Sequence, residues 1–439
     1  MKNHISWLFT QIHQWIDEGI IQKEQAERII QRYLVYEKKT RYFSVSMIFP
    51  AIGAIICGLG VILFFAYNWE SMHKFIKLSI IFSTLIVTHA SAVYIRQNRP
   101  DIAALGDGLH LFGTMLFGSG IWLIAQIYHI SEHYPNAFFI WGMGAILMAW
   151  ALLSISQGIV ASLIMIFWQG FEVFDFQIVH HIAPLVIFIG ILLLAFYIKS
   201  IVLLFVGIFT LLLSLCFTVI ELKEGLFFYI VFFYANILIA LGINEHIRKK
   251  FAFGVNVFTL FGTLIYLIIL YLLCFEGFLK EISHLYKLRE FTDIGMMYYY
   301  GFLVIVIITW VNTLIPDFHE ILFPINKIQS PALPMMVLIG IIAITHGWTE
   351  VRGNWIIQLF FNLMFIMHSI FYILHGCQRI HAGLTTLGCV MFIAIVFARY
   401  IDLFDSLLMR SLVFILTGMI IFGIGTYYTR AKKQRQHSL

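Results

Sequence analysis

The stretch AFFIWGMGAILMAWALLSISQGIVASLIMIFWQGFEVF, Ala137–Phe174, decides the fold of this sequence. A bilayer core of about 30 Å needs about 20 apolar residues per helix. The stretch is too long for one crossing, so it predicts a tight hairpin with its break at Ser154-Ile155-Ser156-Gln157. Ile182–Ile220 is too long in the same way, and we expect its break at Lys199-Ser200.

The whole composition agrees with a membrane location, because 61% of the residues are hydrophobic and only 12% are charged. Such a chain lies outside the soluble range. We predict an all-α integral membrane protein with about fourteen transmembrane helices, or twelve if both long stretches are single crossings. The candidate spans are Met47–Tyr67, Phe75–Ile95, Ala103–Tyr128, Ala137–Leu153, Gly158–Phe174, Ile182–Ile198, Ile201–Ile220, Gly225–Ile243, Ala252–Phe275, Met296–Ile315, Pro331–Thr345, Trp355–Leu374, Ala382–Tyr400 and Leu408–Tyr428.

The distribution of charge tests this count. With the N-terminus inside, most of the 28 basic residues fall in cytoplasmic segments, as the positive-inside rule requires, and both termini are cytoplasmic. Merging only one hairpin would place Arg248-Lys249-Lys250 outside. Pro331–Thr345 is short and begins with prolines, so it either spans the bilayer or is re-entrant, with its backbone covered by protein or water.

The charge pattern also divides the chain into three parts. Residues 1–46 are expected to form a small cytoplasmic helical hairpin, 47–428 the polytopic transmembrane domain, and 429–439 a basic cytoplasmic tail. Gly19 suits the left-handed cap position that ends the first helix of the head. The head is too small to bury a stable core alone, so we expect it to pack on itself, on the cytoplasmic loops or on a protein partner, or else to lie at the headgroup surface.

Several functional classes are not indicated. The sequence has no P-loop, no dinucleotide fingerprint and no HExxH motif, and no pair among its five cysteines has metal-ligand spacing. We therefore expect no cofactor and no metal. The net charge of +5 follows from the inside-loop asymmetry, so nucleic acid is not implied, and the lipid bilayer is the one expected partner of the spans. A charged segment precedes the first apolar run, so no signal peptide is expected. Oligomeric state cannot be predicted.

The third span carries a polar stripe. Asp107 and His110 share one helix face, and helical spacing adds three more polar side chains to it, Thr114, Gln126 and His129. Ionisable groups at membrane depth usually face a bundle interior or a wet cavity. The stripe therefore predicts a substrate or ion pathway; the alternative is glycine-mediated helix packing with polar residues solvated at its ends.

Polar groups also gather where spans emerge on the outer side. This predicted external rim consists of Asn68, Trp69, Glu70, Glu172, Asp175, Arg399, Asp402, Asp405 and Arg410. One interpretation is a vestibule for a polar ligand, with the arginines binding carboxylate or phosphate. For the cluster of arginines and aspartates we favour a structural role, because its opposite charges can neutralise each other.

Three motifs in order resemble an uncharacterised bacterial membrane family, domain of unknown function 2157. They are Trp15-Ile16-Asp17-Glu18-Gly19-Ile20-Ile21 with Glu24-Gln25-Ala26, then Asn68-Trp69 with the run into Ala125-Gln126-Ile127-Tyr128-His129, and finally Arg399-Tyr400-Ile401-Asp402-Leu403-Phe404. The resemblance implies a multi-pass protein of the bacterial inner membrane and no known activity.

Three functions fit these observations. The first is a transporter or flippase-like carrier of a small polar or lipid-linked solute, which many short-looped spans and a polar stripe favour. The second is a membrane-embedded enzyme that acts on a lipid-linked substrate at the outer face through rim carboxylates. The third is a non-catalytic scaffold or sensor that signals through the head. Whether the chain is an enzyme is left open, with the balance against it.

Overall fold

This computed structural model describes single positions within 11–28 and 52–60, and then residues 73–99, 102–130, 133–220, 224–244, 253–285, 292–314, 330–346, 355–403 and 407–437. The side chains of 224, 281–285, 400–403, 407–414 and 431–437 are not among those described. By its contacts the chain divides into two compact units, Met1–Ser131 and Glu132–Leu439. The predicted three-part division stays a prediction.

In the first unit, two long helices form an antiparallel hairpin, α4 (Lys74–Asn98) and α5 (Ala103–Ile127). In the head, the described positions at 11–12, 14–16 and 23–28 are helical, with Gly19 between them at φ 72°. The predicted left-handed cap at Gly19 is therefore confirmed. The backbone N–H of Ile20 donates to Trp15 O at 2.9 Å and closes this helix end.

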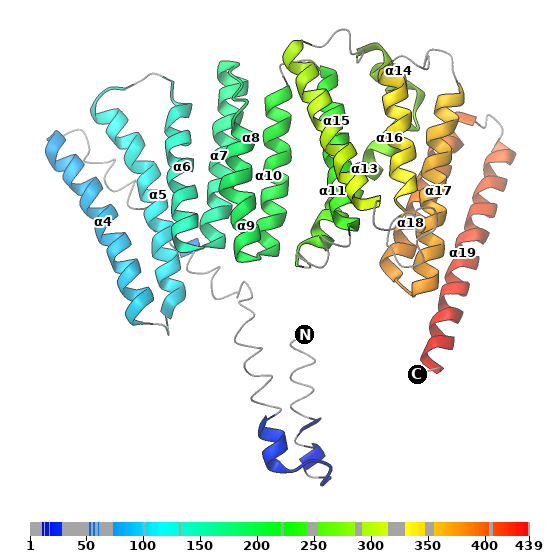
Figure 1. The fold of residues 1–439 in the computed structure, drawn as a ribbon, viewed down its shortest axis with the longest axis horizontal. Helices are drawn as coiled ribbons and strands as arrows, with labels where there is room; N and C mark the ends of the chain where they lie inside the picture. The colour runs from blue at the N-terminus through cyan, green and yellow to red at the C-terminus, as the bar shows by residue number, and fades with distance from the viewer. Residues whose placement is uncertain are drawn as a thin grey trace. The chain divides into compact units, whose positions relative to one another are not determined.

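The second unit begins with the two predicted hairpins. The first long stretch forms helices α6 (Pro135–Leu152) and α7 (Ile155–Phe176). The second forms α8 (Ala183–Ile187), π-helix η2 (Phe188–Leu192), α9 (Leu193–Ile198) and α10 (Ile201–Val219) (Figure 1). Both turns use one device, a left-handed residue followed by a serine cap. Leu153 and Lys199 have φ 49° and 54°, and the next serine hydroxyl accepts a backbone N–H in each case.

The predicted breaks are thus confirmed at Ser154 and Lys199-Ser200, although Ile155-Ser156-Gln157 already forms the first turn of α7. Each of the two long stretches is a helical hairpin, and the choice between fourteen and twelve spans stays a prediction. The predicted span Met47–Tyr67 lies mostly outside the described residues, so the total of fourteen and the orientation of the termini stay predictions.

The remaining helices of this unit are α11 (Glu224–Ile243), α13 (Val255–Leu273), α14 (Glu276–Leu285), α15 (Asp293–Leu314), α16 (Ala332–Thr345), α17 (Trp355–Arg379), α18 (Ala382–Leu403) and α19 (Leu407–His437). No strand occurs in the described part of the chain. Ten described helices are long and apolar enough to cross a membrane, and Ala183–Ile198 and Ala332–Thr345 are shorter apolar helices. Helix α14 lies in the connection between α13 and α15.

The core of the second unit runs from α6 to α18, and its part between α11, α13, α15 and α17 is rich in aromatic rings. Tyr229, Tyr266 and Tyr299 are fully buried there. His368 illustrates how polar groups are accommodated: its Nδ1 lies 2.7 Å from Met364 O and its Nε2 3.2 Å from the Tyr266 hydroxyl. Nδ1 therefore donates and Nε2 accepts, which is the neutral tautomer of a satisfied core histidine.

Candidate functional site

The most enclosed acidic side chain among the described residues is Glu172, in the last two turns of α7. Its side chain is only 1% exposed. A carboxylate that is taken out of water must be paired and hydrogen-bonded, because an isolated buried charge is very costly. The groups around Glu172 therefore show how the buried carboxylate is stabilised.

Three side chains lie against the Glu172 carboxylate, and two of them hydrogen-bond to it. His133 Nε2, from the segment before α6, lies 2.7 Å from Oε2. His180 Nε2, from the segment between α7 and α8, lies at an ion-pair distance of 3.2 Å from Oε1 but makes no hydrogen bond within the described residues. The Trp168 indole N–H, one turn earlier on α7, donates to Oε1 at 3.1 Å. The His180 ring also stacks on Trp168, with 4.8 Å between ring centroids. We call Glu172, His133, His180 and Trp168 the Glu172 cluster.

The two imidazoles connect this buried carboxylate to the surface. The side chain of His133 is 26% exposed and that of His180 is 37% exposed. Imidazole is the side chain best suited to shuttling protons near neutral pH. The two rings therefore join the enclosed carboxylate to a surface that water reaches.

Next to this cluster, Gln169 presents an unsatisfied polar atom. The residue is 2% exposed, and its Oε1 has no hydrogen-bond partner within the described parts of the chain. Gln169 and Glu172 are three residues apart on α7 and so share a helix face. Since buried polar atoms are almost always paired, this oxygen marks a place for a donor from water or from a bound solute.

At the surface, Tyr134 and Asp175 hold the same two segments together. The Tyr134 hydroxyl donates to Asp175 Oδ2. This hydrogen bond, followed by burial and the charge of Asp175, raises the pKa of Tyr134 to about 12. The ring of Tyr134 also packs edge-on against Phe171 and Phe176. Of the predicted rim residues, Glu172 and Asp175 thus lie at one end of α7, in contact with the chain that precedes α6.

The polar stripe of α5 is brought against α4 at its N-terminal half. Asp107 Oδ1 lies 3.9 Å from Arg96 Nε, and His110 Nδ1 lies 3.1 Å from His89 Nδ1. Thr114 donates to the backbone carbonyl of His110. His110 is 2% exposed, and its Nε2 has no hydrogen-bond partner among the described residues.

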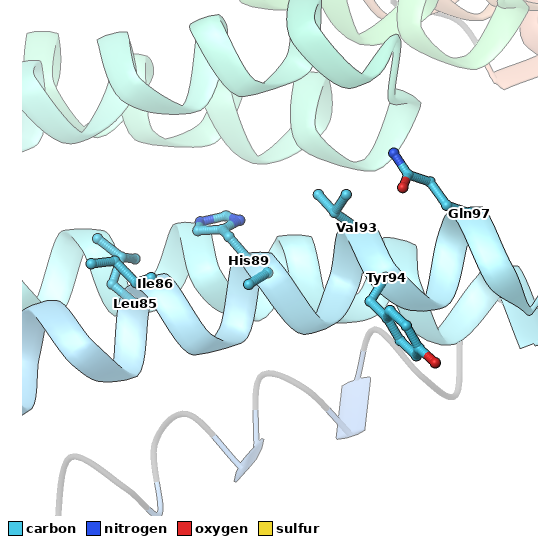
Figure 2. A pocket seen from close by; sticks show the side chains of 7 residues that line it. Leu85, Ile86, His89, Val93, Tyr94 and Gln97 are labelled. Atoms are coloured by element: carbon cyan, nitrogen blue, oxygen red, sulfur yellow. The ribbon is translucent and has the colours of Figure 1, made fainter.

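The same face of α5 carries glycines at seven-residue intervals. A Cβ added at any of these glycines would contact α4. At Gly106 it would meet Ala92 and Arg96, at Gly113 it would meet His89, and at Gly120 it would meet Ile81. This half of the stripe is therefore a close-packed helix seam. His89 also lines a groove along α4 of about 630 Å³ (Figure 2), formed by Leu85, Ile86, His89, Ala90, Val93, Tyr94 and Gln97.

The other half of the stripe is not drawn into this seam. Gln126 and His129 are exposed at the end of α5, and His129 has φ 55°. The structure thus brings Asp107, His110 and Thr114 together and separates them from these two residues. Whether the stripe forms a pathway stays a prediction.

The remaining rim residues have mixed outcomes. Asn68, Trp69, Glu70 and Asp405 lie outside the described residues, as do the side chains of Asp402 and Arg410. Arg399 is described, and it reaches the carboxyl end of α13. Its Nε donates to Asn362 Oδ1 at 3.0 Å, its Nη2 donates to Cys274 O, and its guanidinium lies over the Phe275 ring.

The contribution of His133 and His180 to the cluster was not predicted. The spacing of Trp168 and Glu172, four apart on one helix, indicates that this pair can meet. Nothing in the sequence shows that His133, which is 39 residues from Glu172, reaches the same carboxylate. In the described part of the chain, no group of three or more histidine, cysteine, aspartate or glutamate side chains is arranged to hold a metal ion.

Comparison with known proteins relates the N-terminal third of the chain to a sequence family. No curated protein and no solved structure matches the chain. A family model does match, from the head through α4, α5 and α6 to the first turn of α7. This stretch holds the first two motifs of the resemblance. The third, Arg399–Phe404, lies beyond it, so its resemblance to the family stays a prediction. Residues 13–158 match the family described as "Predicted membrane protein (DUF2157)", which confirms the resemblance over that part of the chain.

Proposed function

We propose that the chain is a proton-coupled carrier of a small polar solute in a bacterial inner membrane, with Glu172 as the residue that takes up and releases the proton. The enclosure of Glu172 between two partly exposed histidines carries this proposal. Ionisable residues within membrane helices commonly mark proton relays and ion pathways.

The position of the cluster supports coupling between protonation and movement. His133 precedes α6, Glu172 belongs to α7, and His180 precedes α8, so one carboxylate holds three consecutive helices at the same end. A protonated carboxyl group is a weaker acceptor than a carboxylate. Uptake of a proton by Glu172 therefore loosens contacts to two flanking segments at once, and this is the kind of local electrostatic change that biases a two-state element.

Gln169 supports a solute site beside the proton site. Its buried Oε1, on the same face of α7, is satisfied if a hydroxyl or amino group of a solute binds there. We retain Asp107, His110 and Thr114 as a second, separate set of ionisable and polar residues in this proposal. The His89–His110 pair lies between α4 and α5, and the groove along α4 gives access to His89.

An enzyme at the outer face is the second candidate. The Tyr134–Asp175 pair at the surface favours it, because a phenol bonded to a carboxylate is able to take part in acid–base chemistry. Against it, Glu172 is too enclosed to touch a lipid-linked substrate directly. The two candidates differ in outcome: a carrier moves a solute unchanged, whereas an enzyme releases a product.

Solute-driven proton movement tests the proposal. The full chain is reconstituted into liposomes that contain a pH-sensitive dye, and neutral amino acids, monosaccharides and small organic acids are added in turn. We expect one solute class to change the internal pH, and Glu172→Gln to abolish that change. Glu276→Gln, which removes another carboxylate in contact with Lys280, serves as the matched control and retains it. Solute uptake without a pH change, or full activity of Glu172→Gln, contradicts the proposal.

A further inference from the structure

A second site lies at the other end of the second unit, between α17 and α19. A groove of about 350 Å³ separates these helices. Its walls are mostly apolar and consist of Ile373, Leu374, Cys377 and Gln378 on α17 and Ile420, Gly423, Ile424 and Tyr427 on α19. The four α19 residues follow helical spacing, so a single face of that helix forms one wall.

The end of the groove is fixed by a contact between the two helices. The Tyr428 hydroxyl donates to Ile380 O at 3.1 Å, directly after the last residue of α17. Tyr427 and Gln378, which both line the groove, therefore lie at about the same level. Beyond this level α19 continues as a helix to His437, and Figure 1 shows it extending past the ends of α17 and α18.

Positive charge is concentrated where the groove ends. Arg379 is the last residue of α17 and is exposed, and the continuing α19 carries four more basic residues, Arg430, Lys432, Lys433 and Arg435. The sequence contains no aspartate or glutamate from Gly376 to Tyr400 or from Ser406 to Leu439. The positive-inside rule predicts this end of the helices to be cytoplasmic.

From these observations we propose that the groove binds an anionic diacyl phospholipid of the cytoplasmic leaflet. One acyl chain lies between α17 and α19, and the phosphate lies beyond Tyr428 on the side of the exposed Arg379 and Arg430. Basic pockets between transmembrane helices on the cytoplasmic side recognise anionic lipid headgroups. This inference does not depend on the carrier proposal.

The dimensions match such a ligand. Ile420 and Arg430 are separated by about 15 Å along the helix axis, at 1.5 Å per residue. One leaflet contributes about half of a hydrocarbon core of about 30 Å. The distance along α19 from the groove to the basic residues thus matches the length of an acyl chain that ends in a headgroup. The neighbouring α19 side chains Leu416, Met419 and Phe422 are more than half exposed, as expected of a helix whose outer surface contacts lipid.

A free phosphate compound does not explain the site. It would be attracted by the basic residues but would leave the apolar groove unoccupied. Only a molecule with a long apolar chain joined to an anion matches both parts, and in a bilayer that molecule is an anionic lipid.

Two glycines of α19 allow a matched test. A side chain added at Gly423 or Gly425 would meet nothing within 4 Å, so both positions tolerate a larger residue. Gly423 lines the groove, and Gly425 does not. Gly423→Trp fills the space for the acyl chain, whereas Gly425→Trp makes the same chemical change two residues away on the same helix.

The experiment measures lipid binding by the purified, delipidated full chain. Native mass spectrometry counts bound lipids, and tryptophan fluorescence follows thermal unfolding as phosphatidylglycerol or phosphatidylcholine is added. We expect phosphatidylglycerol to bind at least tenfold more tightly than phosphatidylcholine and to raise the unfolding temperature. Gly423→Trp should weaken its binding at least tenfold, and Gly425→Trp should bind as the natural sequence does.

The basic residues are tested separately. Replacing Arg430, Lys432, Lys433 and Arg435 by glutamine should remove the preference for phosphatidylglycerol, and Lys199→Gln, which removes another predicted cytoplasmic charge, should keep it. Glycerol phosphate, which carries the anion without the chains, should not compete. Equal binding of both lipids, equal binding by the two tryptophan variants, or competition by glycerol phosphate would each overturn the inference.

Discussion

The imidazole of His89 fills the hollow that Gly113 leaves on α5: a Cβ on this glycine would lie 2.5 Å from His89 Nε2. The other nitrogen of the same ring, Nδ1, lies 3.1 Å from His110 Nδ1. The absence of a side chain at Gly113 is therefore what allows His89 to reach His110. This one relationship joins the glycine seam to the polar stripe of α5.

Gly113→Ala should displace the His89 ring and weaken the α4–α5 hairpin. Overpacking of this kind costs about 1–3 kcal/mol, to be measured as a lower free energy of unfolding in detergent by tryptophan fluorescence. His89→Ala removes the clash, so adding Gly113→Ala to His89→Ala should cost almost nothing further. Losses that simply add in the double variant would show that the two residues do not interact in this way.

We expect Tyr134 to ionise at a higher pH than an ordinary tyrosine. An ordinary tyrosine has a pKa of about 10, and the hydrogen bond to Asp175 raises that of Tyr134 to about 12. Because the folded-state pKa lies above the unfolded one, this contact stabilises the fold fully below pH 10, and its contribution is lost as the pH rises through 12. The absorbance difference between the natural sequence and Tyr134→Phe at 295 nm isolates this phenol during an alkaline titration.

The control for that titration is Asp175→Asn, which removes the charged acceptor. In this background the Tyr134 difference curve should move back towards an ordinary tyrosine midpoint. A midpoint near 10 in the unaltered chain would be evidence that the Tyr134–Asp175 hydrogen bond is absent in solution.

The two interhelical turns in the second unit were predictable because local chemistry sets them. Each apolar stretch is too long for a bilayer, and each break contains a serine that caps the next helix. Helical spacing likewise predicts that Asp107, His110 and Thr114 share a face. These inferences use only residues that are close in the sequence.

The Glu172 cluster and the partner of Arg399 depend instead on contacts between distant segments. The sequence suggests aspartates within two helical turns as partners of Arg399, and this pairing stays a prediction because those side chains lie outside the described ones. The sequence does not show that the guanidinium also binds Cys274 O, 125 residues away. Every residue type carries a backbone carbonyl, so the sequence does not show which carbonyl accepts this hydrogen bond. For the same reason the sequence gives Glu172 as a rim carboxylate but does not show its enclosure by His133 and His180.

Arg399 is expected to stabilise the carboxyl end of α13. The last carbonyls of a helix carry partial negative charge and lack intrahelical partners, so a guanidinium is favourable there. Arg399→Lys keeps the charge but cannot donate from two nitrogens in a fixed plane to both Asn362 and Cys274. We expect it to lower the free energy of unfolding by about 1.5–3 kcal/mol, the range for a hydrogen bond to a charged group.

Lys280→Gln provides the comparison for that variant. In the natural sequence the Lys280 ammonium pairs with Glu276 one helical turn away, and both side chains are about half exposed. Exposed pairs of this type contribute about 0–1 kcal/mol. A larger effect at Lys280 than at Arg399, measured by chemical unfolding in the same detergent, would argue against a stabilising role for Arg399.

The crossing of α17 and α18 depends on Gly388, and this gives the sharpest test of the helix packing. A Cβ at Gly388 would lie 2.8 Å from both Ile373 N and Ser369 O, which are backbone atoms that cannot move aside alone. The Ser369 hydroxyl also donates to Gly388 O at 2.8 Å. Gly388→Ala must therefore push the two helices apart and lengthen this hydrogen bond.

We expect Gly388→Ala to lower the unfolding temperature of the purified chain, with Gly301→Ala as its matched control. Gly301 lies inside α15, and a Cβ there meets nothing within 4 Å. Since alanine is the better helix former by about 1 kcal/mol, Gly301→Ala should leave the unfolding temperature unchanged or raise it. The two variants make the same chemical change in a helix interior, so the difference between them reports the contact with α17 alone. Similar unfolding temperatures for both would mean that α17 and α18 do not approach each other this closely.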